Sequence, residues 1–316
     1  MATVQTTTAP KAPGRPPGPE LGARARAVGR RAEAMAGLVL ASPALVIFTV
    51  FMFVPLALTV WYSLHRYSGF GRMTFIGSQN YKDIVDDPTF WRALLNTAVY
   101  TALSVPIGIT LGLGAALLLN KVMPGRTLLR ALVYVPVVVS GVASGIIFLR
   151  LFDPLLGVLN QIMSSVGLPT VDWQGNGVAA FASVIIVTTW QGVGFGMVVY
   201  LAGLQGIPRE MYEAAALDGA VGWKSFRYIT WPLLGPTTFF LVVFSIITSF
   251  QVFDVVYVLT RGGPGTSTTF LVQYAYDQGF NQRHQGYAAA IGVILYVIVL
   301  VLTVLQWRLS RRRDEA

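Results

Sequence analysis

The sequence predicts an all-α integral membrane protein with six membrane-spanning helices. Of its 316 residues, 54% are hydrophobic and only 12% are charged, and the mean hydropathy is +0.61. Soluble domains carry about 25% charged residues, so this composition excludes a globular enzyme with a large core. The chain has no cysteine, which excludes disulfides, Cys-ligated zinc and thiolate catalysis. Two histidines, His65 and His284, leave little material for a metal site.

Six uncharged runs are about as long as the 20 or so apolar residues that a membrane helix needs. They are Ala36–Leu64, Ala93–Asn120, Ala131–Leu149, Gly177–Pro208, Trp231–Phe253 and Gln285–Trp307. The first run is too long for a signal-peptide core, so we interpret it as a retained anchor. We expect a transmembrane domain over residues 35–309, a disordered basic tail over 1–34 and a short tail over 310–316.

The Lys and Arg residues predict how the chain is oriented. With the N-terminus inside, the inner segments hold sixteen of these residues and the outer segments hold seven. Because cytoplasmic loops carry the excess of positive charge, both termini are expected in the cytoplasm of a multi-pass cell-membrane protein. The basic residues behind the net charge of +9 lie at the ends of the spans. This placement indicates a role in membrane orientation and lipid contact, and no nucleic-acid partner.

Small elements are predicted inside and between the spans. The outer loop over residues 150–176 has leucine and isoleucine at helical spacing from Asp153 to Val166, which indicates a helix in the interface. Glycine pairs four residues apart let helix backbones approach each other. We interpret them as packing contacts, with a moving gate as the alternative; they are Gly108/Gly112, Gly141/Gly145 and Gly192/Gly196.

A polar stretch over residues 209–232 interrupts the apolar chain. Pro208 fits the start of a helix, the alanines after Glu213 are strong helix formers, and Gly219 can end that helix in a left-handed conformation. A second short helix is expected over residues 221–228, before Pro232. The two helices would form a compact knob on the cytoplasmic side that a partner grips. The alternative is a solvated connector.

This loop and two other segments carry recognisable motifs. The loop reads Glu213-Ala-Ala-Ala-Leu-Asp-Gly219, then nine residues, then Ile229-Thr-Trp-Pro232. It resembles the EAA signature of permease subunits of binding-protein-dependent ABC importers, with Trp231 where leucine is usual. The other two segments resemble the carbohydrate-importer branch and its maltose-permease-like first subunit. They are Phe253-Asp-Val-Val-Tyr-Val-Leu-Thr-Arg-Gly-Gly-Pro264 and Asn80-Tyr81 with Asp87-Pro88-Thr-Phe-Trp91 and Asn96-Thr97.

The resemblance implies the type I importer permease fold with a cytoplasmic coupling helix. It also implies four kinds of partner: an ABC ATPase dimer, a second homologous six-helix permease, an extracytoplasmic solute-binding protein and a sugar-like substrate. No G-x-x-x-x-G-K-[ST] phosphate loop occurs in the sequence, so ATP and Mg are expected on the partner ATPase, and this chain would be a non-catalytic subunit without a cofactor. The residues implied in ATPase coupling are Glu210, Glu213, Ala214, Ala215, Asp218, Gly219, Trp223 and Phe226.

The resemblance also implies a sugar site at mid-membrane, formed by the span before the coupling loop and the span after it. Hydroxyls and aromatic rings suit a sugar, and amides are fewer here than in maltose permeases, which points to another oligosaccharide or a glycerol-phosphate conjugate. The implied contacts are Thr188, Gln191, Gly192, Phe195, Ser245, Thr248, Ser249 and Val252. In the alternative, the hydroxyls bond to carbonyls of their own helices. We interpret Asp254 as a helix cap or a bundle contact.

Three other functions are weighed against the importer. A self-contained secondary transporter would need inverted repeats and intramembrane acids, and only Asp254 is a candidate acid. An intramembrane enzyme would need catalytic residues inside the membrane, but the chain has no cysteine and its two histidines lie at the edges of the apolar runs. An exporter half-transporter would carry its own ATPase domain. Co-purification with an ATPase and a second permease separates the importer from the secondary transporter.

Overall fold

A computed structural model describes residues 35–314, so the predicted N-terminal tail lies outside the described part. The chain divides into two compact units, residues 1–58 and 59–316. In the first unit the described residues are helical and include the π-helical turn η1, Thr49–Phe53, before α2, Val54–Ser63, which continues into the second unit. Almost all of their side chains are exposed, as in Leu40, which is 83% exposed, and this suits a helix surrounded by lipid.

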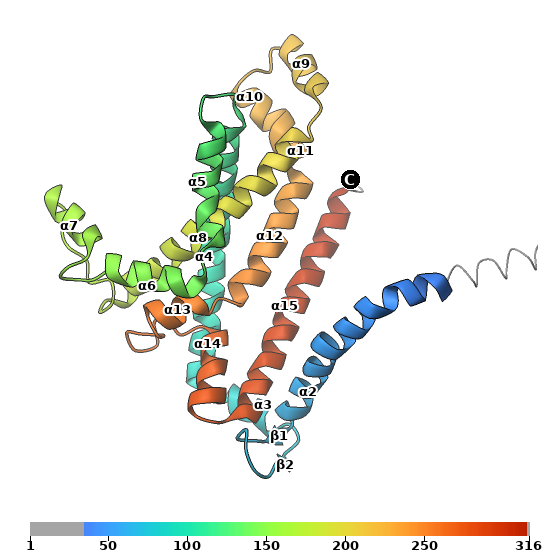
Figure 1. The fold of residues 1–316 in the computed structure, drawn as a ribbon, viewed down its shortest axis with the longest axis vertical. Helices are drawn as coiled ribbons and strands as arrows, with labels where there is room; N and C mark the ends of the chain where they lie inside the picture. The colour runs from blue at the N-terminus through green and yellow to red at the C-terminus, as the bar shows by residue number, and fades with distance from the viewer. Residues whose placement is uncertain (1–34, 315–316) are drawn as a thin grey trace, which may run out of the picture. The chain divides into compact units, whose positions relative to one another are not determined.

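The second unit is a bundle of helices with one small antiparallel sheet (Figure 1). The sheet pairs His65 with Phe75 and Arg66 with Thr74. After α2 the elements in chain order are β1 (His65–Arg66), β2 (Thr74–Phe75), α3 (Gln79–Val85), α4 (Pro88–Asn120), α5 (Arg126–Val138), α6 (Gly141–Leu151), α7 (Val158–Ser165), α8 (Gly177–Gln205), α9 (Arg209–Leu217), α10 (Trp223–Ser225), η2 (Phe226–Thr230), α11 (Trp231–Leu233), α12 (Gly235–Phe250), α13 (Asp254–Leu259), α14 (Leu271–Tyr276), η3 (Asp277–Asn281) and α15 (Gln285–Asp314).

Five helices of the described chain are long and apolar enough to cross a membrane. They are Met35–Ser63, Pro88–Asn120, Gly177–Gln205, Gly235–Leu259 and Gln285–Arg308. A sixth crossing requires α5 and α6 together, and these two helices meet at an angle of 100°. The prediction of an all-α membrane protein is therefore confirmed, and the described residues reach the predicted six spans when α5 and α6 count as one. The predicted helix in the outer loop is present as α7.

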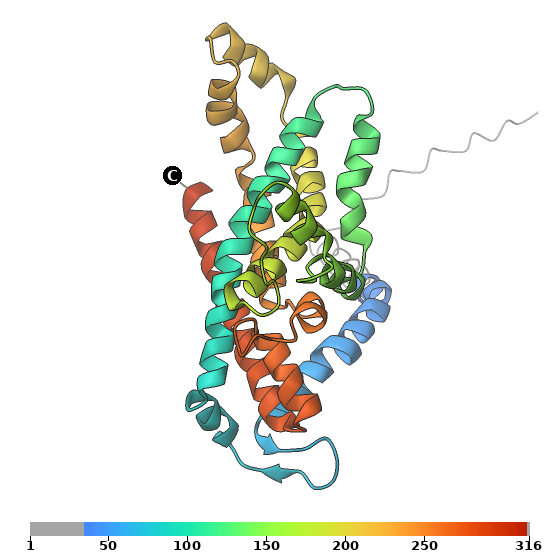
Figure 2. The same ribbon diagram turned by 90° about the vertical axis from the view of Figure 1, so that its left-hand side faces the viewer.

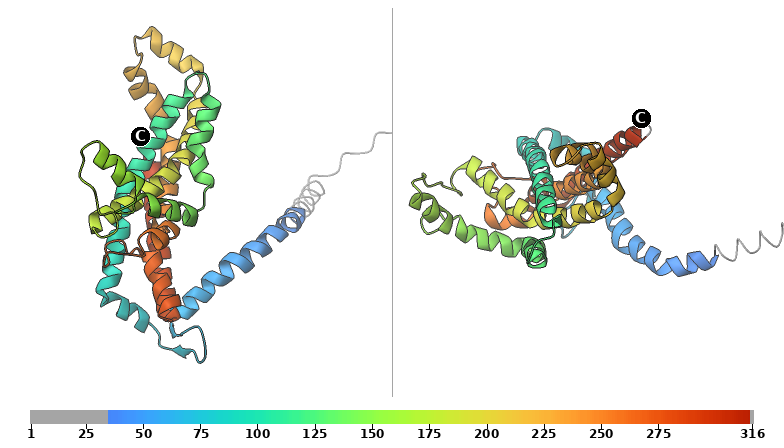
Figure 3. Two further views of the ribbon diagram at one scale, coloured as in Figure 1. Left: turned by 60° about the vertical axis from the view of Figure 1, so that its left-hand side comes forward. Right: turned by 90° about the horizontal axis from the view of Figure 1, so that it is seen from above.

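The prediction of one continuous third span over residues 131–149 is wrong. The helix stops at Val138, shortly after Pro136, and restarts at Gly141. Pro136 lacks a backbone N–H, and the Ser140 side chain accepts a hydrogen bond from the Ala143 N–H at 3.2 Å, so it caps a new helix. The apolar run over residues 131–149 therefore contains a sharp bend that its hydropathy does not indicate. Helices α6 and α7 project sideways from the bundle (Figures 1 and 3).

The prediction that the second short helix ends before Pro232 is also wrong. From Trp223 the chain is helical through α10, η2 and α11, with one turn residue, Leu234, before α12. Pro232 follows the π-helical turn η2 almost directly, so its missing N–H and its ring fall where the helix is already wider than an α-helix. The fifth span runs past the predicted Phe253 to Leu259, but its helix is interrupted, because α12 stops at Phe250 and α13 begins at Asp254.

Three buried clusters follow one another along α4. Near its start, Phe90 packs in a cluster that α14 and α15 complete with residues such as Leu271 and Ile291. Tyr100 joins a second cluster with α8 and α13, and Leu113 joins a third with α8 and α12. Because α4 contacts every cluster, it is the central support against which the other helices are placed.

A carboxylate joins three elements at the start of α4. Asp87 caps α4 by accepting a hydrogen bond from the Thr89 N–H at 2.8 Å. Its other oxygen accepts hydrogen bonds from the hydroxyls of Tyr274 on α14 and Tyr287 on α15, the latter at 2.6 Å. Burial opposes ionisation of this group, but the hydrogen bonds outweigh burial and lower the pKa of Asp87.

Replacing Asp87 with asparagine is expected to lower thermal stability at neutral pH and to weaken its dependence on acid. Since the pKa of Asp87 is lower in the folded protein than its ordinary value of 3.8, the carboxylate stabilises the fold above that value. This contribution is lost as the pH falls through the folded value. Melting curves in detergent from about pH 7 to about pH 3 measure it. Asp86→Asn, at the exposed neighbouring position, is the control and should keep the wild-type acid dependence; equal slopes for wild type and Asp87→Asn would contradict the assignment.

Candidate functional site

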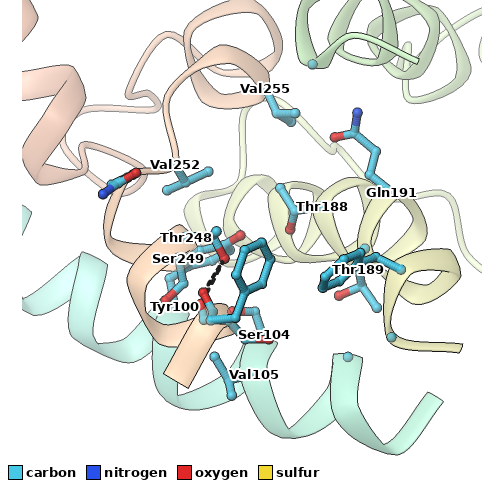
Figure 4. A pocket seen from close by; sticks show the side chains of 18 of the residues that line it. Tyr100, Ser104, Val105, Thr188, Thr189, Gln191, Thr248, Ser249, Val252 and Val255 are labelled. Atoms are coloured by element: carbon cyan, nitrogen blue, oxygen red, sulfur yellow. Dashed lines mark hydrogen bonds between the residues drawn. The ribbon is translucent and has the colours of Figure 1, made fainter. Parts of the chain in front are cut away.

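A cavity of about 540 Å³, here called the central cavity, lies between α4, α8 and α12 and the segment that joins α12 to α13. Figure 4 shows its hydroxyl and aromatic side chains converging from these elements. The structure brings all the predicted substrate contacts to this one cavity. They are Thr188, Gln191, Gly192 and Phe195 from α8, Ser245, Thr248 and Ser249 from α12, and Val252 from the segment after α12.

The hydroxyls of the cavity also bond to their own helices. Thr188 donates to the Val184 carbonyl at 2.8 Å, and Thr248 donates to the Phe244 carbonyl at 3.0 Å. The Ser249 hydroxyl donates to a carbonyl of α12 and lies 2.8 Å from the hydroxyl of Thr101 on α4. For these three residues the alternative, that the hydroxyls bond to carbonyls of their own helices, therefore holds. It does not remove them from the cavity, because a donating hydroxyl keeps lone pairs that accept hydrogen bonds.

Gln191 links α8 to the bend between α5 and α6. Its side-chain NH₂ donates to the Ser144 hydroxyl at 2.9 Å and to the Val139 carbonyl at 3.2 Å. The amide thus satisfies a carbonyl that the bend leaves without its helical partner. Gln191 therefore positions the bent helix pair as well as lining the central cavity.

Aromatic rings supply the apolar part of the cavity wall. Phe195 on α8 and Phe244 on α12 lie with their ring centroids 4.8 Å apart, and Tyr100 contributes a third ring from α4. A wall that combines rings with a few fixed polar groups is the usual design of a small-molecule site. The cavity can hold a ligand that has both apolar faces and hydroxyl edges.

Sequence reasoning missed the contribution of α4 and some polar neighbours. The lining residues that were not predicted as contacts include Tyr100, Ser104 and Asp254, and also Thr189 and Gln251, which lie next to predicted contacts. Tyr100 and Ser104 are four residues apart and so share one face of a helix, but the spacing does not show that this face meets the cavity. Thr189 has a buried hydroxyl oxygen without a hydrogen-bond partner in the described structure, a feature that only the fold reveals.

Asp254 opens α13 and also lines the central cavity. Its Cβ lies so close to Gly141 that a Cβ added to that glycine would be 2.7 Å away. We expected a helix cap or a bundle contact. The side chain makes no capping hydrogen bond within the described chain, and its proximity to Gly141 is a contact within the bundle. The position beside the cavity was not expected. Among the described residues, no group of three or more His, Asp or Glu side chains is placed to hold a metal ion.

The polar loop over residues 209–232 forms a hairpin at the end of the second unit opposite β1, β2 and α3 (Figures 1 and 2). Pro208 precedes α9 as its N-cap residue, as the sequence predicted. At the other end of α9, Gly219 has φ of 75° and its N–H donates to the Ala216 carbonyl at 3.1 Å, while the Ala220 N–H donates to the Ala215 carbonyl at 2.8 Å. This is the Schellman pattern of helix termination.

The predicted coupling residues lie on both faces of this hairpin. Glu210, Glu213, Ala214, Asp218 and Gly219 are exposed, and Ala215 is buried against the hairpin. Glu213 forms an exposed ion pair with Arg209 at 3.0 Å, one turn away on α9. Such a surface pair contributes about 0–1 kcal/mol, so it is easily exchanged for another partner.

The second arm of the hairpin presents aromatic rings. Trp223 is 74% exposed and stacks on Phe226 with ring centroids 5.1 Å apart, while Phe226 also packs against the core cluster of α4, α8 and α12. Sequence reasoning missed two further apolar side chains here, Leu217, which is 92% exposed, and Val221. Exposed apolar side chains gathered on a short hairpin are typical of a protein-binding surface.

Comparisons with known proteins agree with this geometry. Residues 108–315 match the family described as the inner membrane component of binding-protein-dependent transport systems. A trehalose/maltose transport system permease protein of Thermococcus litoralis is 36% identical over 89% of this chain and 96% of its own length. A lactose transport system permease protein of Rhizobium radiobacter is 37% identical over 88% of this chain and 94% of its own.

One further relative and one solved structure are also similar to this chain. A sulfoquinovosyl glycerol transport system permease protein of Agrobacterium fabrum is 34% identical over 89% of this chain and 92% of its own length. Among solved structures, a chain of a bacterial alginate ABC transporter, in complex with an alginate pentasaccharide-bound periplasmic protein, has a TM-score of 0.78 and 26% identity. That match covers 90% of this chain and 96% of the other.

Proposed function

The chain belongs to the inner membrane components of binding-protein-dependent transport systems, and from this premise we propose that its central cavity is the passage for a sugar. It is a multi-pass membrane protein with the type I permease fold and a permease subunit of an ATP-driven sugar importer. The observation that carries the proposal is that the sugar contacts expected from the sequence, which come from two separate spans, line one cavity with aromatic walls.

The proposed substrate is an oligosaccharide or a glycerol conjugate. Relatives carry names with trehalose and lactose, which are neutral disaccharides, and with sulfoquinovosyl glycerol, a glycerol conjugate whose sugar carries an anionic sulfonate. Of the described residues that line the central cavity, Asp254 is the one with a formally charged side chain. A single carboxylate repels an acidic sugar and leaves a neutral one unopposed, so the charge of the cavity favours neutral sugars over anionic ones.

The energy is proposed to come from a separate ATPase dimer that binds the hairpin over residues 209–232. The exposed side chains of Leu217, Val221 and Trp223 would be covered in that complex, and Glu213 would exchange its exposed pair with Arg209 for a basic residue of the ATPase. With both termini in the cytoplasm, the hairpin faces the compartment that holds ATP. The complete transporter would also contain a second permease and an extracytoplasmic solute-binding protein.

Transport is proposed to proceed by alternating access. ATP binds the closed ATPase dimer preferentially, and the hairpin passes this preference to the helices around the central cavity. The second arm of the hairpin runs through η2 and α11 into α12, which lines the cavity, and this provides a direct mechanical link. The binding protein delivers sugar when the cavity opens outward, and ATP hydrolysis on the partner resets the cycle.

The experiment is sugar uptake into proteoliposomes that hold the complete transporter, with ATP on the ATPase side. Trehalose, lactose and sulfoquinovosyl glycerol are tested as radiolabelled substrates together with the binding protein. We expect uptake of at least one of them that stops when ATP or the ATPase is left out. Uptake by this chain alone, driven by a proton or sodium gradient, would instead establish the secondary transporter that we weighed as the alternative.

Enlarging Thr248 to leucine is expected to raise the half-saturating sugar concentration for uptake. Thr248 lines the central cavity, so the larger side chain occupies space that the sugar needs. A misfit of this size in a pocket is worth about tenfold or more. Thr303→Leu is the matched control, because Thr303 on α15 also donates its hydroxyl to its own helix, at 2.8 Å to the Val299 carbonyl, and does not line this cavity. Equal effects of the two substitutions would argue against the assignment.

A further inference from the structure

Four aromatic side chains form a continuous ladder that begins at the central cavity. Phe253, which lines that cavity, lies 5.3 Å from Tyr257 and 5.0 Å from Tyr276, measured between ring centroids. Tyr276 also lies 5.3 Å from Tyr257 and stacks on Phe280 at 4.9 Å with an interplanar angle of 24°. The ladder therefore runs without a gap from the junction of α12 and α13 to η3.

The direction of the ladder follows from the elements that carry it. Phe253 lies beside the central cavity, and Phe280 lies in η3, just before α15 begins. That end of the second unit is the one opposite α9, as Figures 1 and 2 show. The ladder thus extends from the central cavity towards the end of the molecule that faces away from the hairpin.

A second cavity of about 540 Å³, here called the outer cavity, lies beside the middle of this ladder. Tyr257 and Tyr276 contribute rings to its wall. Its polar side chains carry both signs of charge and two amides, and they are Arg261, Gln273, Asp277 and Asn281. Rings on one side and planar hydrogen-bonding groups on the other give this cavity the same chemical character as the central one.

One feature of the outer cavity has no explanation in the fold alone. Gln273 is only 8% exposed, and its side-chain oxygen has no hydrogen-bond partner in the described structure. A buried acceptor without a donor is unfavourable and rare in native proteins, so a donor is expected from a ligand or a water. Arg261 also lines this cavity; its φ of 51° is the left-handed conformation that commonly ends a helix, here α13, and its N–H donates to the Val256 carbonyl at 2.9 Å.

We propose that the outer cavity and the aromatic ladder form a saccharide-binding subsite from which a sugar passes to the central cavity. A pyranose ring has apolar C–H faces and hydroxyl edges. Its face can lie on the rings of Tyr257 and Tyr276, which line the cavity, and a hydroxyl at its edge can donate to the free oxygen of Gln273. Opposite charges on Arg261 and Asp277 suit a neutral sugar better than an ion of either sign.

The subsite rests on the proposed function, because it takes the same class of ligand as the central cavity. Each step along the ladder replaces one ring contact with the next, since neighbouring centroids are about 5 Å apart. The ring faces and edges that the stacking leaves uncovered would offer the sugar apolar contacts on the way to Phe253. The alternative is that these rings pack against the second permease and meet no sugar.

Cysteine protection tests the subsite, because the chain itself has no cysteine. Single cysteines are placed at Asn281 in the outer cavity, at Ser245 in the central cavity and at Phe70, which is 79% exposed in the loop between β1 and β2. The complete transporter is treated with N-ethylmaleimide with and without trehalose, lactose or sulfoquinovosyl glycerol, and labelling of this chain is followed on a gel.

We expect at least one of the sugars to slow labelling of Asn281→Cys about fivefold or more and to leave Phe70→Cys unchanged. Adding Tyr276→Ala should abolish that protection, while Tyr276→Phe, which keeps the ring, should preserve it. Protection at Ser245→Cys alone, protection at none of the positions, or protection of Asn281→Cys that survives Tyr276→Ala would overturn the subsite. ATP-driven uptake by the same preparation decides the proposed function separately.

Discussion

Replacing Gly194 with alanine is expected to destabilise the protein by about 2 kcal/mol or more, although the change adds a single methyl group. A Cβ at this position would lie 2.5 Å from the Val133 carbonyl oxygen and 2.9 Å from the Tyr134 Cα. Both are backbone atoms of α5, which cannot move aside as a flexible side chain can. The contact of α8 with α5 must therefore open, and the melting temperature in detergent should fall together with the yield of folded protein.

Gly192→Ala is the matched control, two residues away on the same helix. A Cβ on Gly192 meets no heavy atom within 4 Å. Alanine is also the better helix former, by roughly 0.5–1 kcal/mol over glycine. We expect the melting temperature of this variant to equal or exceed that of the wild type. Equal losses of stability for the two variants would show that α5 and α8 do not pack as described.

Valine at Gly219 is expected to reduce ATP-driven sugar uptake at least tenfold while the melting temperature of the helical bundle stays close to that of the wild type. Gly219 has φ of 75°, which costs an ordinary residue about 1–2 kcal/mol and a β-branched residue more. Nothing crowds the position, so the effect comes from the backbone alone. The end of α9 would then shift, and the surface offered to the ATPase would change.

Asparagine at the same position is the control for Gly219→Val. Asparagine adopts positive φ more readily than other residues, so Gly219→Asn should retain most of the uptake. Gly222, the other glycine of the hairpin bend, has φ of 59° and ψ of −120°, a region that is disfavoured for every residue with a Cβ. Gly222→Asn should therefore fail where Gly219→Asn succeeds. Full uptake by Gly219→Val would remove the coupling role from this turn.

The helical hairpin shows how far the sequence alone could go. Pro208, the alanine run and Gly219 define α9 through local chemistry, and the structure places its start and its end where that chemistry indicates. The second helix does not end before Pro232, because this proline follows η2, where the helix is already wider than an α-helix. Capping and helix-propensity rules located α9 and the helix after it. They did not determine whether that second helix continues past Pro232, because this depends on the three-dimensional path of the chain.

The central cavity was likewise predicted from the sequence only in part. Polar residues in otherwise apolar spans, such as Thr188 and Thr248, were recognised from the sequence and share one cavity in the fold. Tyr100 and Ser104 were not recognised, because which face of α4 meets α8 and α12 is decided by packing. The bend between α5 and α6 was missed for a similar reason, since hydropathy reports how apolar a run is and not where it turns.

Glycine spacing was informative only in part. A Cβ on Gly112 would lie 3.2 Å from the backbone of Gly196, so these two glycines allow α4 and α8 to approach closely. Gly108 and Gly192 belong to the same spaced pairs, yet a Cβ on either meets nothing within 4 Å. The spacing identifies candidates for close contact, and the rotation of each helix selects which of them is used.

The most direct test of the whole account is whether the hairpin lies in the cytoplasm under an ATPase. A cysteine at Leu217, the exposed last residue of α9, is unique in this chain and can be labelled with a membrane-impermeant maleimide. We expect labelling in inside-out vesicles, no labelling in right-side-out vesicles, and protection when the ATPase subunit is bound. Labelling from the outer side, or reactivity that the ATPase leaves unchanged, would contradict the claim that a separate motor drives these helices through this hairpin.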